Sequence, residues 1–396
     1  MDLPKFFAVD FFCGAGGTTR GLIDAGGFVI AGVDKDRRCS DTYTKNNPNQ
    51  HLTNAEPAFL NRDIFPKSPA YAQGEQDTLL AELTHLIGQL RRAHPKVPLL
   101  FAICAPCQPF TTLARKELSE ARKSGRERDS NLLSEAAKFV AHFKPEMVLS
   151  ENVQGIGDSR YGGVWDAFEA KLQSLGYATG TEVVCTSKFG VPQHRRRSIL
   201  LAVKRPEGSR EATLVVPTSD PATPTKTVRQ ALEAAALPPI KAGEHWKDDP
   251  NHRARSLSPT NLKRLALAEP GASNAYMEKG EAVALMLDCH KRVNQRVGTR
   301  CFTDVYTRMH PDRPSPTITT KCHSISNGRF GYFDKAQNRG ISLREAAILQ
   351  SFPPEYVFYP TNQVDPVARM IGNAVPPRLA EFFSRHLIGL LEPPAS

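Results

Sequence analysis

The chain has 396 residues, 40% of them hydrophobic, a length that suits two domains with cores of ordinary size. No uninterrupted apolar stretch is long enough to cross a bilayer, which argues against a membrane protein. Lys and Arg number 51 and Asp and Glu 41; the resulting charge of +10 favours an anionic partner, although many proteins are mildly basic without binding nucleic acid.

The first 17 residues have an apolar look, but Lys5 and Asp10 interrupt them. They also run straight into glycines rather than into a cleavage site, so a first core strand is favoured over a signal peptide. We therefore expect an intracellular, cytoplasmic protein.

A glycine-rich turn is predicted near the N-terminus. A strand over residues 6–11 leads into the run 14–17 (Gly-Ala-Gly-Gly), and a helix over residues 18–25 follows. Such turns are common between strands and helices, so a turn without a ligand stays open. Asp34 favours a ligand, because it ends a second predicted strand, 28–33, where an acid can accept ribose hydroxyls.

The ligand of this turn is expected to lack a pyrophosphate. The run lacks the third glycine of a dinucleotide site, and the chain has no Gly-Lys-Ser/Thr phosphate loop. A nucleoside such as S-adenosylmethionine fits better. Phe12 would stack on its adenine, and Asp63 would accept the adenine amino group.

Two reactive side chains follow predicted strands farther along the chain. A helix over residues 77–92 precedes a buried strand over 99–103, and Cys107 lies just past that strand. Glu151 lies just past a strand over 147–149. Because open α/β sheets bind ligands at the carboxyl ends of their strands, both side chains are expected at one edge.

Cys107 and Glu151 suggest attack on an electron-poor ring. Cytosine C5 is too weak a nucleophile to take a methyl group unaided, but a thiolate that adds to C6 makes C5 an enamine carbon. Glu151, as a carboxylic acid with a raised pKa, would supply a proton at ring N3. A lone cysteine is ordinarily an inert buried thiol and a loop acid is ordinarily solvated, so each interpretation depends on the other.

The eight cysteines are expected to be free thiols rather than a disulfide framework. Cys104-x-x-Cys107 is a poor redox motif, because Pro109 keeps its predecessor out of helical geometry. A zinc site would need a second such pair, and the other cysteines and histidines are too scattered to supply one. No metal is expected.

Basic residues occur on both sides of Glu151. Arg195 and Arg197 alternate at the start of a predicted strand and are expected to share a face, one reaching the base or a phosphate and the other holding the cysteine loop. Residues 111–130 carry six Lys and Arg and could close over a nucleic-acid backbone. The alternatives are a solvated basic edge and a mobile surface loop. A cytosine within a duplex would have to flip out of the stack.

The pattern changes after Val203. Residues 205–227 are rich in Pro, Gly, Ser and Thr, which indicates a linker or the irregular start of a new domain. Segments up to about residue 340 are short and poorly periodic. Helices are predicted again over residues 342–349 and 378–391.

Taken in order, these motifs resemble those of the DNA (cytosine-5) methyltransferases of prokaryotic restriction-modification systems. The matching segments are 10–17, Asp34, Asp63, Pro106-Cys107-Gln108, Glu151-Asn152-Val153, Gln193-x-Arg195-x-Arg197, 342–347 and 372–377. The catalytic residues that the resemblance implies are Cys107, Gln108, Glu151, Asn152, Arg195 and Arg197. The S-adenosylmethionine-binding residues that it implies are Asp10, Phe12, Gly14, Gly16, Gly17, Asp34, Asp63, Pro106, Asn373 and Ala374. The chain departs from the family at Lys35 and Ala105, and neither departure removes a catalytic group.

The resemblance also implies an architecture and a substrate. The fold would be α/β, a doubly wound, mostly parallel, Rossmann-like sheet with a second, smaller, irregular domain. Residues 1–203, completed by 364–396, would form the catalytic domain, and residues 204–363 the target-recognition domain and hinge. The chain would act as a monomer on double-stranded DNA. A partner restriction endonuclease, a phage-defence system and a stand-alone role all stay open.

Two alternatives to a DNA enzyme remain. A transfer-RNA cytosine-5 methyltransferase shares these motifs, and Cys301-Phe302-Thr303 weakly resembles a signature of that subgroup. The stretch that follows, residues 304–320, looks instead like the bacterial DNA enzymes. The second alternative is a silent DNA-binding scaffold, against which the intact Cys107, Glu151 and Arg197 argue.

Overall fold

The computed structural model describes residues 2–53, 55–106, 131–157, 163–205 and 213–391. The chain divides into two compact units. The first comprises residues 1–189, 196–223 and 374–396, and the second comprises residues 190–195 and 224–373. No helix in the described ranges is long and apolar enough to span a membrane.

The first unit is built on a seven-stranded sheet in the order β3-β2-β1-β4-β5-β7-β6. Its strands are β1 (Phe6–Phe11), β2 (Gly27–Val33), β3 (Ala58–Leu60), β4 (Leu99–Ile103), β5 (Met147–Val153), β6 (Tyr177–Cys185) and β7 (Arg196–Lys204). Strands β1 to β5 run parallel to one another, whereas β7 runs antiparallel to both β5 and β6. The prediction of a mostly parallel α/β sheet is therefore confirmed.

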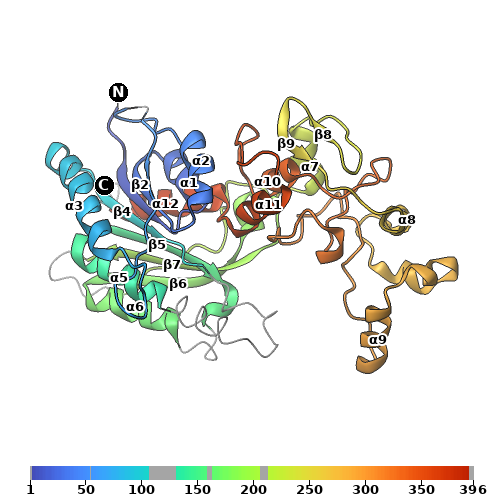
Figure 1. The fold of residues 1–396 in the computed structure, drawn as a ribbon. Coiled ribbons are helices and arrows are strands. Elements are labelled where there is room, and N and C mark those ends of the chain that lie inside the picture. The colour runs from blue at the N-terminus through green and yellow to red at the C-terminus, as the bar shows by residue number, and fades with distance from the viewer. Residues whose placement is uncertain (1, 54, 107–130, 158–162, 206–212, 392–396) are drawn as a thin grey trace. The chain divides into compact units, whose positions relative to one another are not determined.

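Helices cover both faces of this sheet (Figure 1). They are α1 (Gly17–Asp24), α2 (Ser40–Asn46), α3 (Gln76–Ala93), α5 (Leu132–Phe143), α6 (Val164–Ser174) and α12 (Pro377–Leu391), with short 3₁₀ helices η1 (Arg37–Cys39), η3 (Gln154–Gly157) and η5 (Thr186–Phe189). Alternate residues of β1 point to opposite faces. Phe7 and Val9 join the core cluster that includes residues of α3, α5 and α6. Phe6 and Ala8 join the cluster that includes residues of α1 and α12.

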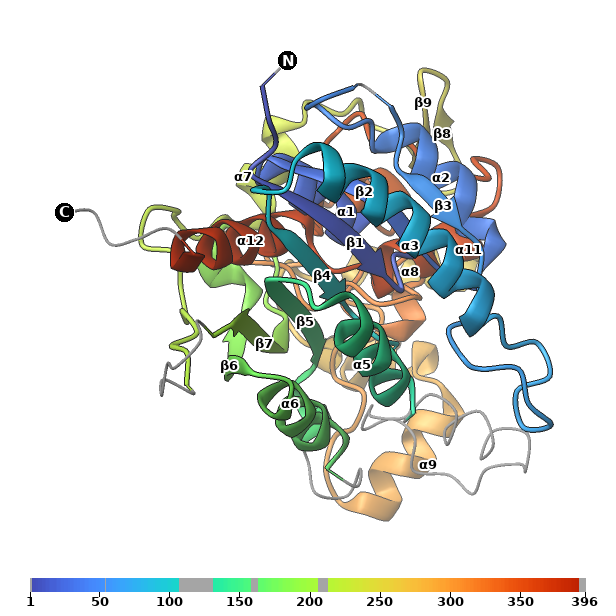
Figure 2. The same cartoon turned by 90° about the vertical axis from the view of Figure 1, so that its left-hand side faces the viewer.

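The last of these helices packs against the first. α12 lies beside α1, far from it in sequence (Figure 2). The approach is close because Gly21 has no side chain: a Cβ there would lie 2.3 Å from the carbonyl oxygen of Pro377 and 2.7 Å from the Cβ of Ala380. Residues 374–396 thus belong to a unit whose other parts end at residue 223.

The second unit has little regular structure. Its elements are α7 (Val228–Ala234), β8 (His245–Trp246), β9 (Asp249–Arg253), α8 (Pro259–Leu267), η6 (Asn274–Glu278), η7 (Gly280–Leu285), α9 (Asp288–Val297), η8 (Ile325–Asn327), α10 (Leu343–Leu349) and α11 (Val364–Asn373). Irregular backbone leaves buried carbonyl groups that need donors. Fully buried arginines supply them: Arg308 donates to the carbonyl oxygens of Leu265, Ala268 and Tyr332.

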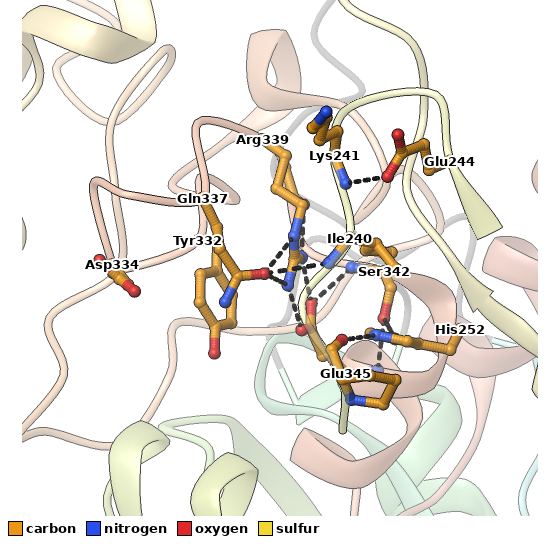
Figure 3. A network of polar contacts seen from close by, with 12 residues as sticks. Ile240, Lys241, Glu244, His252, Tyr332, Asp334, Gln337, Arg339, Ser342 and Glu345 are labelled. Atoms are coloured by element: carbon orange, nitrogen blue, oxygen red, sulfur yellow. Dashed lines mark hydrogen bonds and ion pairs between the residues drawn. The ribbon is translucent and has the colours of Figure 1, made fainter. Parts of the chain in front are cut away.

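A buried ion pair fixes the start of α10 (Figure 3). Both Arg339 terminal nitrogens donate to Glu345, each at 2.7 Å, and the guanidinium lies 4.1 Å from the centre of the Tyr332 ring. Glu345 also accepts from the Ser342 N–H, and the Ser342 hydroxyl accepts in return from the Glu345 N–H, which makes a capping box. His252 contacts the same hydroxyl at 2.9 Å. Polar contacts therefore add to the apolar packing at this point, where Ile341 and Leu343 are also buried.

The two units have different bounds from the domains that the sequence predicts. Residues 364–373 form α11, which packs on α10 within the second unit, and the first unit resumes only at Ala374. Residues 204–223 belong to the first unit, whereas 190–195 belong to the second.

Candidate active site

The glycine-rich turn between β1 and α1 has the backbone of a tight strand-to-helix connection. Phe12, Gly14 and Gly16 have φ angles of 62°, 50° and 88°, and Gly16 caps α1, whose first residue is Gly17. Glycine adopts this left-handed region without steric cost. A Cβ on Gly14 would meet nothing within 4 Å among the described residues, so this side of the turn borders open space. The turn can therefore receive a ligand close to its backbone.

Asp34, directly after β2, holds the turn in place. Its Oδ2 accepts from the Gly14 N–H at 2.9 Å, and its Oδ1 accepts from the Asp36 N–H at 2.7 Å. Burial raises the pKa of this carboxyl. A carboxylate oxygen has two acceptor positions, so both oxygens can still accept from ligand hydroxyls.

Asp10 lies at the base of the turn on β1 and is fully buried. Its Oδ2 accepts from the Thr19 hydroxyl at 2.7 Å, while its Oδ1 has no hydrogen-bond partner in the described part of the chain. Burial raises the pKa of Asp10 to about 7. An unpartnered buried carboxyl oxygen is costly unless something pairs with it, and the N–H or ammonium donors of a ligand would do so.

Asp63 follows β3 and is 9% exposed. Its Oδ1 accepts from the Phe65 N–H at 3.3 Å, and its own N–H donates to Glu75 at 3.3 Å. These contacts fix the loop that carries the carboxylate.

The segment that leads to the proposed nucleophile is anchored on β5. The Asn152 side chain donates to the Ala105 carbonyl oxygen at 3.1 Å, and the Ser150 hydroxyl donates to that of Ile103 at 2.5 Å. Pro106 is exposed, and Cys107 and Gln108 lie outside the described residues. Asn152 is thus tied to the residue two positions before Cys107.

Glu151 and Arg197 form an ion pair at the same edge. The Arg197 Nε lies 2.8 Å from the Glu151 Oε1, and both side chains are 11% exposed. The pair forms because β7 runs antiparallel to β5, which sets Glu151 opposite Ile199, two residues from Arg197. Side chains two residues apart on a strand share a face. The carboxylate that the sequence assigns to the ring therefore has a fixed cationic neighbour.

Arg195 has a different environment from Arg197. β7 begins at Arg196, and Arg195 belongs to the second unit, where it is 4% exposed. Its Nη1 donates to the carbonyl oxygens of Ile318 and Gly372, at 3.1 and 3.0 Å. The two arginines were expected to share a strand face, and this does not hold because Arg195 precedes the strand.

Asn373 and Ala374 lie at a change of unit. Asn373 is the exposed last residue of α11 in the second unit, and Ala374 is the first residue of the returning part of the first unit.

The glycine turn and the cysteine segment leave neighbouring strands. β1 pairs with β4, Phe11 opposite Ile103, so both chains leave the sheet at one edge. The Thr18 hydroxyl lies 4.0 Å from the Cys104 sulfur, which joins the two. Burial and then the Glu151 charge raise the pKa of the Cys104 thiol. Sequence reasoning treated Cys104 only as a redox partner and gave Ser150 no role, although Ser150 directly precedes Glu151.

The C-5 cytosine-specific DNA methylase family matches residues 6–67 and 88–389. The chain is 32% identical over 386 residues to the Type II methylase M.HgiDII of Herpetosiphon aurantiacus, covering 97% of this chain and 95% of that protein. It is 24% identical to the Type II methyltransferase M.DdeI of Desulfomicrobium norvegicum, over 96% of this chain and 88% of the other. A solved DNA modification methyltransferase encoded within an E. coli prophage has the same fold, with a TM-score of 0.66 at 20% identity, covering 98% and 99% of the two chains.

Proposed function

Since the chain belongs to the C-5 cytosine-specific DNA methylase family, we propose that it methylates C5 of a flipped-out cytosine in a specific duplex sequence through a covalent bond from Cys107 to ring C6. The observation that carries this proposal is the Glu151–Arg197 ion pair, at the sheet edge where Asn152 holds the segment that leads to Cys107.

Cys107 acts as the nucleophile on the cytosine ring, and Glu151 acts as the proton donor. The Cys107 sulfur forms a bond to C6 while the Glu151 carboxyl, which takes up a proton when the base is bound, gives that proton to N3, so that the negative charge of the thiolate does not remain on the ring. C5 then takes up the methyl group as the bond from the methyl carbon to the donor's sulfonium sulfur breaks, which leaves the electron pair on the sulfur and the donor as a neutral thioether. Loss of the C5 proton to a base breaks the bond from sulfur to C6, and N3 returns its proton to Glu151.

Arg197 positions Glu151. A carboxyl group that must reach one ring atom gains from a partner that limits its rotamers, and the 2.8 Å contact supplies one. Asn152 acts in the same way on the backbone before Pro106.

S-adenosylmethionine is the methyl donor of this family, and when bound it supplies an electrophilic methyl group. The residues of the turn fit it: open space at Gly14, carboxylates at Asp34 and Asp63, and an unpartnered oxygen on Asp10. Asp34 would accept the ribose hydroxyls and Asp63 the adenine amino group, with Phe12 against the ring. Asn373 and Ala374 are proposed to complete this site.

The second unit is proposed to recognise the target. Its irregular backbone is held by buried arginines, which leaves its surface segments available for contacts with a partner. The sequence assigns this role to residues 204–363, and we propose it for the part of them, 224–363, that belongs to the second compact unit.

The experiment that tests the proposal offers duplex DNA and transfer RNA in parallel, with 5-fluorocytosine as a trap. We expect a covalent adduct between the DNA and the wild-type protein and none with Cys107→Ala, which should keep its affinity for DNA. Product from Cys107→Ala would refute the covalent route. Incorporation into transfer RNA alone would refute the DNA substrate, and trapping of neither would indicate a scaffold.

A further inference from the structure

Helix α9 (Asp288–Val297) buries none of its residues. Figure 1 shows it standing off from the other elements of the second unit. Isolated helices of this length are marginal in water, so α9 depends on whatever anchors it. The contacts that anchor α9 show which side of the helix faces the protein, and the side chains on its other side show what ligand it could bind.

One side of α9 is anchored. The His290 ring stacks on Phe302 at 5.0 Å, and the Asn294 side chain accepts from the Cys301 N–H at 2.8 Å. Gly298 ends the helix with a φ of 73°. The adjoining residue Leu287 packs against a small apolar cluster of the same unit. The helix is thus held along one stripe.

The opposite side carries Arg292, Gln295 and Arg296, all exposed. Their spacing of three and four residues places them on one face of the helix. None of the three has a hydrogen bond or ion pair to another described residue, whereas Lys291 pairs with Asp288 at 3.3 Å and Arg300 approaches Glu278 at 3.5 Å. Residues 288–300 hold four basic side chains against one acid.

We propose that α9 enters the major groove of the target duplex and that Arg292, Gln295 and Arg296 read its bases. This inference rests on the proposed function. A helix with its side chains is about 10–12 Å across, and the B-form major groove is about 12 Å wide. Arginine pairs with the O6 and N7 of guanine through two hydrogen bonds, and glutamine pairs likewise with adenine. The excess positive charge attracts the phosphates on both walls of the groove.

The same geometry argues against transfer RNA as the ligand of this surface. The major groove of A-form RNA is deep and narrow, and side chains cannot read it. If α9 reads bases in a groove as proposed, the duplex that it reads is B-form DNA and not transfer RNA.

The test is methylation of a randomised duplex library, read by bisulfite sequencing. We compare the wild-type protein with Arg292→Ala, Gln295→Ala and Arg296→Ala. Each should lose discrimination at one base position by about 10-fold or more. Arg92→Ala, which removes an exposed arginine from α3, serves as the matched control and should keep the wild-type preference.

Arg292→Lys and Arg296→Lys separate base reading from simple attraction. Lysine keeps the charge but lacks the planar pair of donors, so the preference should still relax. An unchanged preference in all three alanine variants would overturn the inference, as would an equal loss of rate on every sequence. Because the three substituted side chains are exposed, melting temperatures should match the wild type. If an alanine variant melts at a lower temperature, the lysine variants decide.

Failure of this inference is distinguishable from failure of the proposed function. A wild-type protein that methylates no DNA overturns both. A wild-type protein that methylates a defined sequence, with α9 variants that keep the same sequence preference, overturns only the role of α9.

Discussion

Asp10 is an unusual residue of the first unit, because its carboxyl group has no solvent exposure and one of its oxygens has no hydrogen-bond partner among the described residues. Burial raises its pKa to about 7, with the Thr19 hydrogen bond opposing the shift. The folded protein therefore holds this proton at pH values where the unfolded chain has lost it. Asp10 costs stability as the pH rises from about 4 to about 7.

We expect Asp10→Asn to remove this cost. The carboxamide can still accept from Thr19 but does not ionise. The free energy of unfolding of the variant, relative to wild type, should therefore rise between pH 4 and pH 8. The expected rise is about 4 kcal/mol, because the pKa of Asp10 differs by about 3 between the folded and unfolded protein. Chemical unfolding at a series of pH values measures the difference. A difference that is constant with pH would contradict the raised pKa.

Individual residues also show the limit of sequence reasoning. The position of Glu151 past a strand is local information, and the pattern predicts it. Its pairing with Arg197 requires knowing that β7 is antiparallel to β5, and the contacts of Arg195 are made with residues 123 and 177 positions away. No local pattern contains such partners.

At the scale of elements, the contact of α1 with α12 depends on one missing side chain. Gly21→Ala would place a Cβ against the backbone of Pro377, which cannot move without shifting the helix. Overpacking of this kind costs about 1–3 kcal/mol or more. We expect a lower denaturation midpoint for this variant.

Gly88→Ala is the matched control. Gly88 lies in α3, and its added Cβ would meet only the end of the Arg92 side chain, at 3.3 Å. Alanine is favoured over glycine within helices by about 1 kcal/mol, so this variant should be neutral or more stable. Equal destabilisation of both variants would rule out the close approach as the cause.

The predicted helices and strands agree with the structure where the spacing of apolar residues within the segment is regular. β1, β2, β4 and α3 lie within a few residues of their expected bounds. The pattern does not predict β6 (Tyr177–Cys185), because Gly180 and the exposed Thr181 and Glu182 interrupt its apolar run. β6 forms through pairing with β7 along its whole length.

For the whole molecule, the charge of +10 predicts how DNA binding responds to salt. Each phosphate that the protein neutralises releases condensed counterions, so affinity should fall linearly on a double-logarithmic plot. With about six phosphate contacts, affinity would fall about 1,000-fold from 50 to 200 mM salt. Titration of a labelled duplex measures the slope, and affinity that is insensitive to salt would contradict a binding surface dominated by phosphates.

The order of the first unit along the chain has a consequence for its synthesis. A ribosome makes residues 1–223, then the whole second unit, and only then α12, whose Leu379, Phe383 and Leu387 cover one face of the sheet. Until those residues emerge, the hydrophobic side chains on that face of the sheet remain exposed to solvent in the nascent chain. Translation that stops before α12 would thus yield a truncated protein that chaperones and proteases can recognise, rather than a truncated enzyme that acts on DNA.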